Sequence, residues 1–511
     1  WGLVDGRMSG DELADLIAPL LDAACAQGMD SFYAADEVIA ALAERGLLFA
    51  TDDLPYPGFR SRMAETVRLA FRLRQLFPKH AGPDGWQQAP TLVADFRFAQ
   101  RRRRYPRRDI DPAALAGEVG ADAAISASLA ALLDARGLDY RLAAFQVRAT
   151  RRILHGLTER RTSGTLVSAG TGSGKTLAFY LPAMARVATL RLDRTGGRSW
   201  VKLLAIYPRT ELLRDQFAEV YAEARRLDPM LGARSAGKVR IGALFAETPT
   251  NAKVLLQHGW DGWRRTEAGW VCGFMPCPAP GCEGDLIWSE QDILSHREAL
   301  ACARCGHRVT GEEVVLTRET LQRDPPDVLF TTTEMLNQRM SDARTRHLFG
   351  LRPGAVRPPE ILLLDEVHSY AGNHGAQVGF LLRRWRHLVR APITFVGLSA
   401  TLRDGVRFFA RLVGLAEHQV EEIRPYREEM VAEGAEYLLA LRGDPVSRTA
   451  LLSTTIQTAM LMARALDRPD GVPSRGLYGQ RVFAFTDDID VTNRLYFSIL
   501  DAEGRNDRGE P

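Results

Sequence analysis

The 511-residue sequence has few cysteines, almost no net charge and no long apolar segment. Six cysteines are too few for a disulfide scaffold in a chain of this length. No apolar run approaches the roughly 18–20 residues that cross a bilayer, and no charged-then-apolar signal segment opens the chain. These absences predict a cytoplasmic protein without membrane contact. Lys and Arg number 66 against 63 Asp and Glu, a net charge of +3, which excludes a uniformly basic nucleic-acid coat but not local basic patches.

The composition is that of a globular protein, and the length predicts about three to five domains. Residues 1–80 read as helical with one short strand, which fits either a winged-helix-like module or a plain helical domain. Residues 81–135 read as a basic connector containing the run Arg101–Arg108. Arginines around Tyr105 suit a phosphate backbone and a stacked base, but they equally suit a solvated face paired with Asp109 and Asp111.

From about residue 136 the pattern changes to short apolar runs separated by helical stretches. The runs cover residues 164–167, 201–206, 328–330, 361–364 and 393–396. Continuous apolar strands alternating with helices are typical of a parallel sheet covered on both faces. The predicted fold class of residues 136–425 is therefore α/β.

A glycine-rich loop follows the first of these strands and opens a helix. Glycines let the backbone turn tightly, so that its N–H groups point at phosphate oxygens, and the helix N-terminus adds partial positive charge. Lys175 is expected to reach the β- and γ-phosphates of ATP, and Thr176 to bind Mg²⁺. The loop consists of Ala169, Gly170, Thr171, Gly172, Ser173, Gly174, Lys175 and Thr176.

A second strand ends in two adjacent carboxylates, Asp365 and Glu366, after the apolar residues 361–364. The carboxyl edge of an open α/β sheet is where such folds bind ligands. Asp365 is expected to hold Mg²⁺ through water, and Glu366 to orient or deprotonate the attacking water.

At these residues the chain resembles the superfamily 2 DEAD/DEAH-box helicases, with a DEVH variant at 365–368. Further blocks follow in the order of that family. The resemblance implies adenine recognition by Gln146, nucleic-acid contact by two blocks, and coupling of hydrolysis to domain movement by a third block together with His368. The nucleic-acid blocks are Pro208, Arg209, Thr210 and Thr331, Thr332, Thr333, and the coupling block is Ser399, Ala400, Thr401.

The segment 368–385 extends the resemblance to the branch of mitomycin-repair helicases and phage-defence helicase subunits such as those of DISARM and Druantia. This implies RecA-like domains, the first at 136–425, with 426–511 as a linker and the start of a second. Residues 481–487 are expected to be a strand of that second domain. No later motif carries arginine fingers, so this chain is expected to hydrolyse ATP poorly. The branch favours DNA over RNA and partner subunits of a defence complex.

Five of the six cysteines fall within 34 residues, inside the first α/β domain. Cys277, Cys282, Cys302 and Cys305 form two knuckles whose spacing suits a tetrahedral structural Zn²⁺. The predicted zinc-ribbon insertion spans about 250–320 and is too small to hold a core without the metal. Spare ligand candidates are Cys272, His296 and His307, and buried free thiols are the alternative.

These patterns predict an ATP-dependent DNA helicase or translocase, the motor subunit of an anti-phage system. A DNA-repair helicase and a DNA-binding ATPase switch that does not unwind are the alternatives. A zinc-stabilised scaffold with an inactive nucleotide site is disfavoured because Lys175, Thr176, Asp365 and Glu366 are all present.

Overall fold

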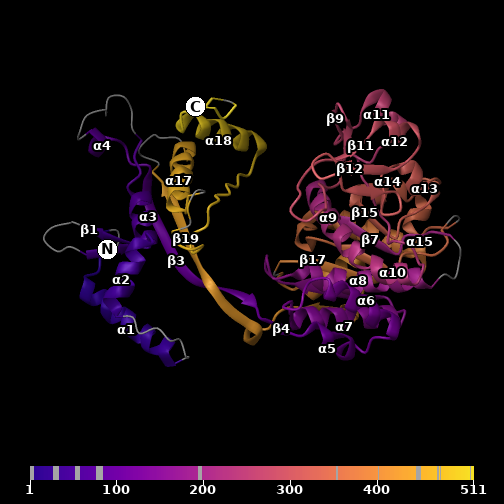
Figure 1. Ribbon diagram of the computed structural model, residues 1–511, viewed down its shortest axis with the longest axis horizontal. Helices are drawn as coiled ribbons and strands as arrows, with labels where there is room; N and C mark the ends of the chain where they lie inside the picture. Colours follow the sequence, from indigo (N-terminus) through magenta and orange to yellow (C-terminus); the bar gives the residue numbers. More distant parts are fainter. Residues whose placement is uncertain are drawn as a thin grey trace. The chain divides into compact units, whose positions relative to one another are not determined.

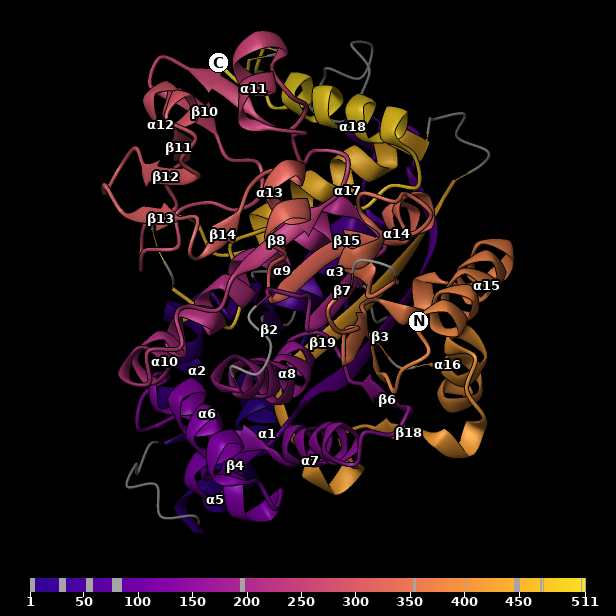
Figure 2. The same cartoon turned by 90° about the vertical axis from the view of Figure 1, so that its right-hand side faces the viewer.

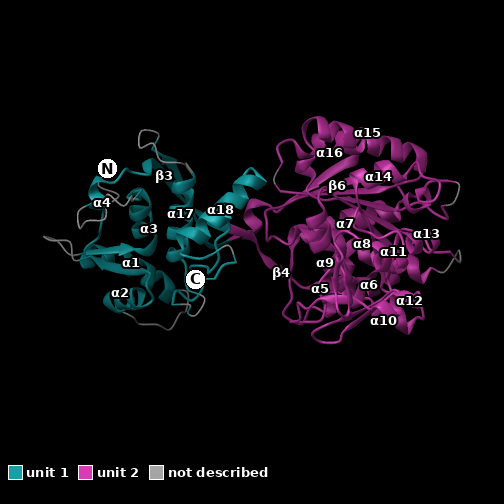
Figure 3. Ribbon diagram, turned by 90° about the horizontal axis from the view of Figure 1, so that it is seen from above, with its two compact units in different colours: residues 1–103, 432–511 teal, residues 104–431 magenta. Residues whose placement is uncertain are grey.

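The computed structural model describes the chain except for residues 1–4, 27–33, 52–57, 76–84, 194–197, 353–354, 401, 445–450, 469–470, 472, 507 and 511. The chain forms two compact units (Figure 3). The first contains residues 1–103 and 432–511, and the second contains residues 104–431. Among the described residues, no helix is both long enough and apolar enough to cross a membrane.

An eight-stranded sheet forms the centre of residues 104–431 (Figures 1 and 2). Its strand order is β14-β8-β15-β7-β16-β17-β6-β18, and all seven neighbouring pairs are parallel. The predicted α/β class with a parallel sheet is thereby confirmed. The strands are β6 Ser163–Ser168, β7 Leu203–Tyr207, β8 Ile241–Leu244, β14 Val314–Val315, β15 Val328–Thr332, β16 Ile361–Leu364, β17 Thr394–Ser399 and β18 Val420–Ile423.

Helices cover both faces of this sheet. Successive strand residues point to opposite faces, so the apolar residues of each strand contribute to two cores. Leu363 belongs to the core under α6, α7, α8 and α9, whereas Leu362 and Leu364 belong to the core under α14, α15 and α16. The helices are α5 Pro112–Glu118, α6 Ala123–Asp134, α7 Ala144–Thr158, α8 Lys175–Leu192, α9 Thr210–Arg226, α10 Asp228–Ala233, α13 Arg318–Arg323, α14 Thr333–Arg339, α15 Gly372–Val389 and α16 Gly405–Val413.

A separate five-stranded antiparallel sheet stands between β8 and β14 in the sequence. Its strands are β9 Arg264–Thr266, β10 Gly269–Val271, β11 Leu286–Trp288, β12 Ala299–Cys302 and β13 Arg308–Thr310, with helices α11 Ala252–His258 and α12 Glu290–Leu294. Phe274 fastens this insertion to the main core, since its ring lies 5.7 Å from Phe217 of α9 and 5.5 Å from Phe245. The insertion therefore shares a hydrophobic core with its host domain, and its predicted need for a metal stays a prediction.

The other unit begins with two helices, an antiparallel strand pair and a third helix. Met8 forms an isolated antiparallel bridge with Phe59 on the second strand. The elements of the unit are α1 Gly10–Ala26, α2 Ala35–Glu44, β1 Leu48–Thr51, β2 Gly58–Ser61, α3 Arg62–Phe71, α4 Gly85–Gln88, β3 Val93–Pro106, β19 Met430–Gly443, α17 Leu451–Ala465 and α18 Ile489–Ala502.

The unit boundaries differ from the predicted ones because of long-range strand pairing. Residues 93–106 form β3, which pairs with β19, so they are not a free connector. Hydrogen bonds from Asp444 N to Leu92 O (3.0 Å) and from Arg107 N to Glu429 O (2.8 Å) make this pair antiparallel. The helices α5 and α6 belong to the α/β core. Residues 426–511, expected to start another domain, instead contribute α17 to packing on α3.

The predicted strand at 481–487 is wrong for this structure, in which those residues form no strand. A strand of a parallel sheet needs neighbours to take its backbone hydrogen bonds. No described strand pairs with this segment, and Phe483 and Phe485 are largely exposed.

Candidate nucleotide site and cysteine cluster

The glycine-rich loop lies between the end of β6 and the start of α8. Gly172 (φ 77°) and Gly174 (φ 86°) have left-handed backbone angles that favour glycine, which lets the loop close tightly before the helix begins at Lys175. The Ser173 hydroxyl donates to Gly170 O at 2.6 Å and holds the loop. Ala169 is tied to the neighbouring strand by its N–H, which donates to Ser399 O at 3.2 Å.

The buried Gln146 amide braces the same loop from α7. It accepts from Ala143 N and donates to Gly174 O, both at 2.9 Å, and only 1% of the residue is exposed. A methyl group at Gly174 would lie 2.6 Å from Gln146 Nε2, so a side chain there would displace the amide. The structure thus places Gln146 against the predicted phosphate loop, and its recognition of adenine stays a prediction.

The carboxylates at the end of β16 face the loop. Lys175 Nζ lies 3.5 Å from Glu366 Oε1, and Glu366 N donates to Asp365 Oδ1 at 2.7 Å. Glu366 has a φ of 45°, a left-handed conformation that is costly for a residue with a side chain and is found at functional sites. Burial raises the pKa of Asp365 to about 6, assisted by the nearby Glu366 charge and opposed by the Glu366 N–H and Lys175.

His368 connects this carboxylate pair with the next strand. Its Nδ1 lies 3.2 Å from Glu366 Oε2 and 3.3 Å from Ser399 Oγ at the end of β17. The structure thus brings together residues predicted for hydrolysis and for coupling. Thr401 lies outside the described residues.

The two predicted nucleic-acid blocks stand at the ends of β7 and β15. Arg209 is exposed, and Thr210 begins α9 after Pro208. In the second block the prediction for Thr331 differs from the structure, because its buried hydroxyl donates to Leu244 O at 2.8 Å inside the sheet. The Thr332 hydroxyl caps α14, and Thr333 is partly exposed.

Sequence reasoning missed Tyr105 and Arg108 at the nucleotide loop. A methyl group at Gly172 would lie 3.3 Å from Tyr105 Cε1, and one at Gly174 would lie 3.4 Å from Arg108 Nη2. The sequence predicts a nucleic-acid contact or a solvated face for this run, and Arg107 does pair with its neighbour Asp109 at 2.7 Å. No local signal places Tyr105 against a loop more than 60 residues later in the chain.

The four knuckle cysteines of the insertion converge. Their sulfur atoms all lie within 4.8 Å of one another, with Cys277 to Cys305 at 3.6 Å and Cys282 to Cys302 at 3.7 Å. Four sulfurs around one Zn²⁺ at about 2.3 Å stand about 3.8 Å apart, so the thiols fit that ion. Among the described residues, the spare candidates Cys272, His296 and His307 lie outside this group.

Backbone N–H groups support one of these sulfurs. Arg304 N and Cys305 N donate to Cys302 Sγ at 3.3 and 3.5 Å. Such outer hydrogen bonds orient the ligands of metal sites. Cys272 lies outside the cluster, and burial raises the pKa of its thiol to about 11.

A glycine-rich loop before a helix, with a neighbouring strand that ends in Asp-Glu, defines a P-loop nucleoside-triphosphatase domain on a parallel sheet. Within that class the family is specific: residues 144–247 and 290–409 match the DEAD/DEAH box helicase family. The chain therefore contains a DEAD/DEAH box helicase domain of superfamily 2, as the sequence motifs predicted. Enzymes of this family hydrolyse ATP.

Curated relatives lie in the predicted branch. The chain is 25% identical over 310 residues to the Druantia protein DruE of Escherichia coli (strain UMEA 4076-1), covering 51% of this chain and 16% of that protein. It is 34% identical over 255 residues to the Lhr helicase/uracil glycosylase of Escherichia coli (strain K12), covering 50% and 12%. The matched segments are thus less than a fifth of these relatives' lengths. A solved structure of the DUF1998 helicase MrfA bound to DNA is similar at 15% identity and a TM-score of 0.41, covering 72% of this chain and 35% of that one.

Proposed function

We propose that this chain carries the ATP-driven motor of a DNA helicase or translocase. The observation that carries the proposal is the meeting of Lys175, Asp365 and Glu366 at the carboxyl edge of the parallel sheet. A phosphate-binding lysine facing a water-orienting carboxylate is the arrangement that phosphoryl transfer requires.

Each residue has a defined part in this proposal. The N–H groups of residues 170–176 and the Lys175 ammonium bind the β- and γ-phosphates, and Glu366 orients water and accepts its proton. The oxygens of Thr176 and Asp365 suit Mg²⁺, which prefers oxygen ligands and neutralises developing charge on the phosphates when bound. His368, between Glu366 and Ser399, links the state of the phosphate site to β17.

The cellular role that we propose is anti-phage defence, with partner subunits in the same complex. The similarity to the Druantia protein DruE supports it. Repair of DNA is the second candidate, supported by the similarity to the Lhr helicase/uracil glycosylase.

ATP hydrolysis with and without single-stranded DNA tests the motor. We expect slow turnover that DNA stimulates, with single-stranded RNA less effective, and loss of turnover in Lys175→Ala. Glu366→Gln should keep nucleotide affinity and lose turnover. Lys253→Ala, which removes an exposed lysine of α11, is the matched control. DNA-stimulated turnover that persists in Lys175→Ala would refute the proposed site.

Strand displacement separates a motor from a switch. A motor moves a labelled strand from a partial duplex only with ATP, and Glu366→Gln abolishes the movement. ATPase activity that DNA stimulates without displacement or stepping would support the switch instead.

We also propose that Cys277, Cys282, Cys302 and Cys305 hold a structural Zn²⁺. Four thiolate ligands leave no open position for a substrate, so the ion would stabilise the fold of the insertion. The spacing of the sulfur atoms supports this assignment.

Metal content tests the zinc proposal. Elemental analysis of the purified chain should give one zinc per molecule, and Cys282→Ser should remove it. Cys25→Ser, which changes an exposed cysteine far from the cluster in sequence, should retain it. Zinc bound equally by the Cys282→Ser chain would refute the ligand set.

A further inference from the structure

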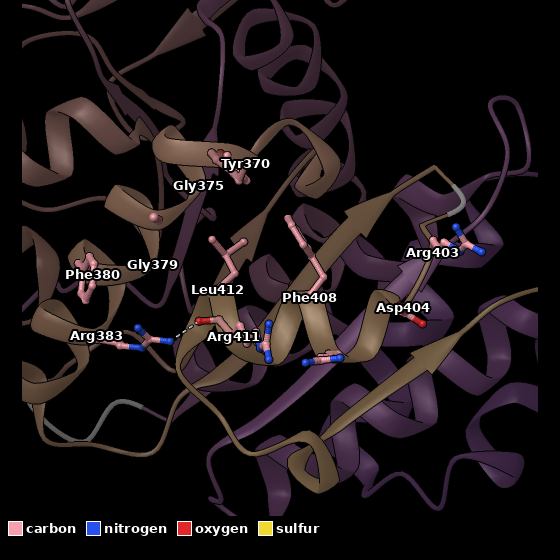
Figure 4. Close-up of a pocket in the computed structure, with 13 residues that line it drawn as sticks. Tyr370, Gly375, Gly379, Phe380, Arg383, Arg403, Asp404, Phe408, Arg411 and Leu412 are labelled. Atoms are coloured by element: carbon pink, nitrogen blue, oxygen red, sulfur yellow. Dashed lines mark hydrogen bonds between the residues drawn. The ribbon is translucent and has the colours of Figure 1, made fainter.

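The face of the helicase domain formed by α14, α15 and α16 carries two adjoining grooves. One lies between α15 and α16, has a volume of about 600 Å³, and is floored by Tyr370, Phe408 and Leu412 (Figure 4). The other has a similar volume and lies between α14 and α15. Phe380 borders both grooves and forms the ridge between them.

Positive charge predominates along this face. Residues 372–390 contain four arginines and two histidines but no Asp or Glu. Across the first groove, α16 contributes Arg407 and Arg411, and Arg403 precedes it. Neither Arg403 nor Arg411 forms an ion pair with any described residue, whereas Arg407 has Glu417 at 4.0 Å. The Arg403 and Arg411 guanidinium groups are therefore available to an anionic ligand, whereas Arg407 is shared with Glu417 and Asp404 adds one carboxylate to this groove.

The aromatic side chain of Phe380 is exposed to solvent at this charged surface. It is 68% exposed, although its helix neighbours Leu381 and Leu382 are buried. The Arg383 guanidinium lies 5.8 Å from its ring centroid. An exposed aromatic beside arginines suits a base stacked on the ring with phosphates on either side.

The second groove reaches the predicted nucleic-acid block. Thr333 and Asn337 of α14 line it opposite His374, Gln377 and Arg384 of α15. Arg384 donates to Asn337 Oδ1 at 2.5 Å across the groove. One carboxylate, Glu334, stands at the rim, where it accepts from Gln338 Nε2 at 2.9 Å. The two grooves thus make a path from Thr333 across Phe380 to the arginines of α16.

We propose that this path binds single-stranded nucleic acid, with a base stacked on Phe380 and phosphates on Arg407 and Arg411. The inference rests on the proposed motor function and extends its nucleic-acid contact from the strand ends to a helical face. An acidic polypeptide would also pair with the arginines. It would not explain, however, why the grooves lead to Thr333 of the predicted nucleic-acid block.

Oligonucleotide affinity tests the path. Fluorescence anisotropy of a labelled oligo-dT strand would be measured with the chain, with Phe380→Ala and with Arg407→Gln/Arg411→Gln. Loss of one stacked base weakens binding roughly 5- to 150-fold. Loss of two phosphate contacts lowers the slope of log affinity against log salt by about 1.4. ATP turnover without DNA should not change.

Matched controls separate a local from a general effect. Leu388→Ala removes an exposed apolar side chain from the same helix, and Arg151→Gln/Arg234→Gln removes two exposed arginines elsewhere in the domain. Both should bind oligo-dT normally.

Each outcome decides a separate claim. Unchanged affinity in Phe380→Ala and an unchanged salt slope in the arginine variant would overturn the path while leaving the motor intact. A chain that binds no oligonucleotide would refute the proposed function and the path together. Labelled poly-L-glutamate would be tested in the same way. If the arginine variant lost binding of poly-L-glutamate but kept binding of oligo-dT, the face would be a surface for an acidic protein and the proposal would be overturned.

Discussion

Asp365 is a carboxyl group that the folded chain holds unfavourably at neutral pH. Its pKa rises from the ordinary value of 3.8 to about 6 on folding, chiefly through burial. The folded chain therefore binds more protons at this group than the unfolded chain between these values. Stability is lost as the pH rises through this range and is not regained above it. The substitution Asp365→Asn removes the titrating group, so the variant should not lose this stability as the pH rises.

The size of the effect follows from the two pKa values. Because the pKa is higher in the folded chain, the free energy of unfolding falls by about 2 kcal/mol as the pH rises from about 4.5 to about 7.5. An asparagine at this position can still accept from Glu366 N, and any cost of its amide hydrogens is the same at both pH values. The Asn variant should therefore gain about 2 kcal/mol relative to the unsubstituted chain across this range.

Urea unfolding in metal-chelating, nucleotide-free buffer measures this difference. Tryptophan emission reports on the helicase domain, because it contains Trp200, Trp260, Trp263, Trp270, Trp288 and Trp385. Asp342→Asn is a control of opposite sign, since the Arg344 N–H and Arg339 lower the pKa of Asp342 and its contribution is lost as pH falls. Parallel pH profiles for the unsubstituted and Asp365→Asn chains would refute the reasoning.

Three further substitutions test other contacts. Asp327→Asn should cost about 3–5 kcal/mol in urea unfolding, because this buried carboxylate pairs with two cations at 2.6 and 2.8 Å, whereas Asp285→Asn, in an exposed pair, should cost at most about 1 kcal/mol. Phe274→Ala should cost about 3–5 kcal/mol and expose the insertion to limited proteolysis, and uncleaved insertion would contradict the anchor. Gly174→Ala should weaken binding of a fluorescent ATP analogue by displacing Gln146, and unchanged affinity would contradict that contact.

The sequence predicted the parts of the site that depend on short-range order. The loop 169–176 and the pair Asp365–Glu366 each follow a buried strand, and parallel strands end at a common edge, so their meeting followed from the alternation of strands and helices. The spacing of the four cysteines likewise predicted their convergence. These features need no knowledge of which distant segments pack together.

Long-range pairing accounts for what was missed. Residues 93–106 read as a basic connector because nothing local indicates that β19, more than 300 residues later, pairs with them. Tyr105 lies near the end of the resulting strand β3, and this position brings it to the nucleotide loop. Thr331 matched a motif whose residues are expected at the surface. Successive residues of β15 point to opposite sides, however, and the Thr331 hydroxyl donates to Leu244 O inside the sheet.

The cysteine-bearing insertion leaves and re-enters the helicase domain on adjacent strands. It follows β8, and β14 then pairs with β8 in parallel, with Val314 opposite Ile241. A short outer strand of this kind leaves little free edge for another chain to extend the sheet. Because β8 and β14 are parallel, any segment that replaced the insertion would have to cross from the carboxyl end of β8 to the amino end of β14. The requirement it would have to meet is an apolar group in place of Phe274, without which Phe217 and Phe245 would lose their cover.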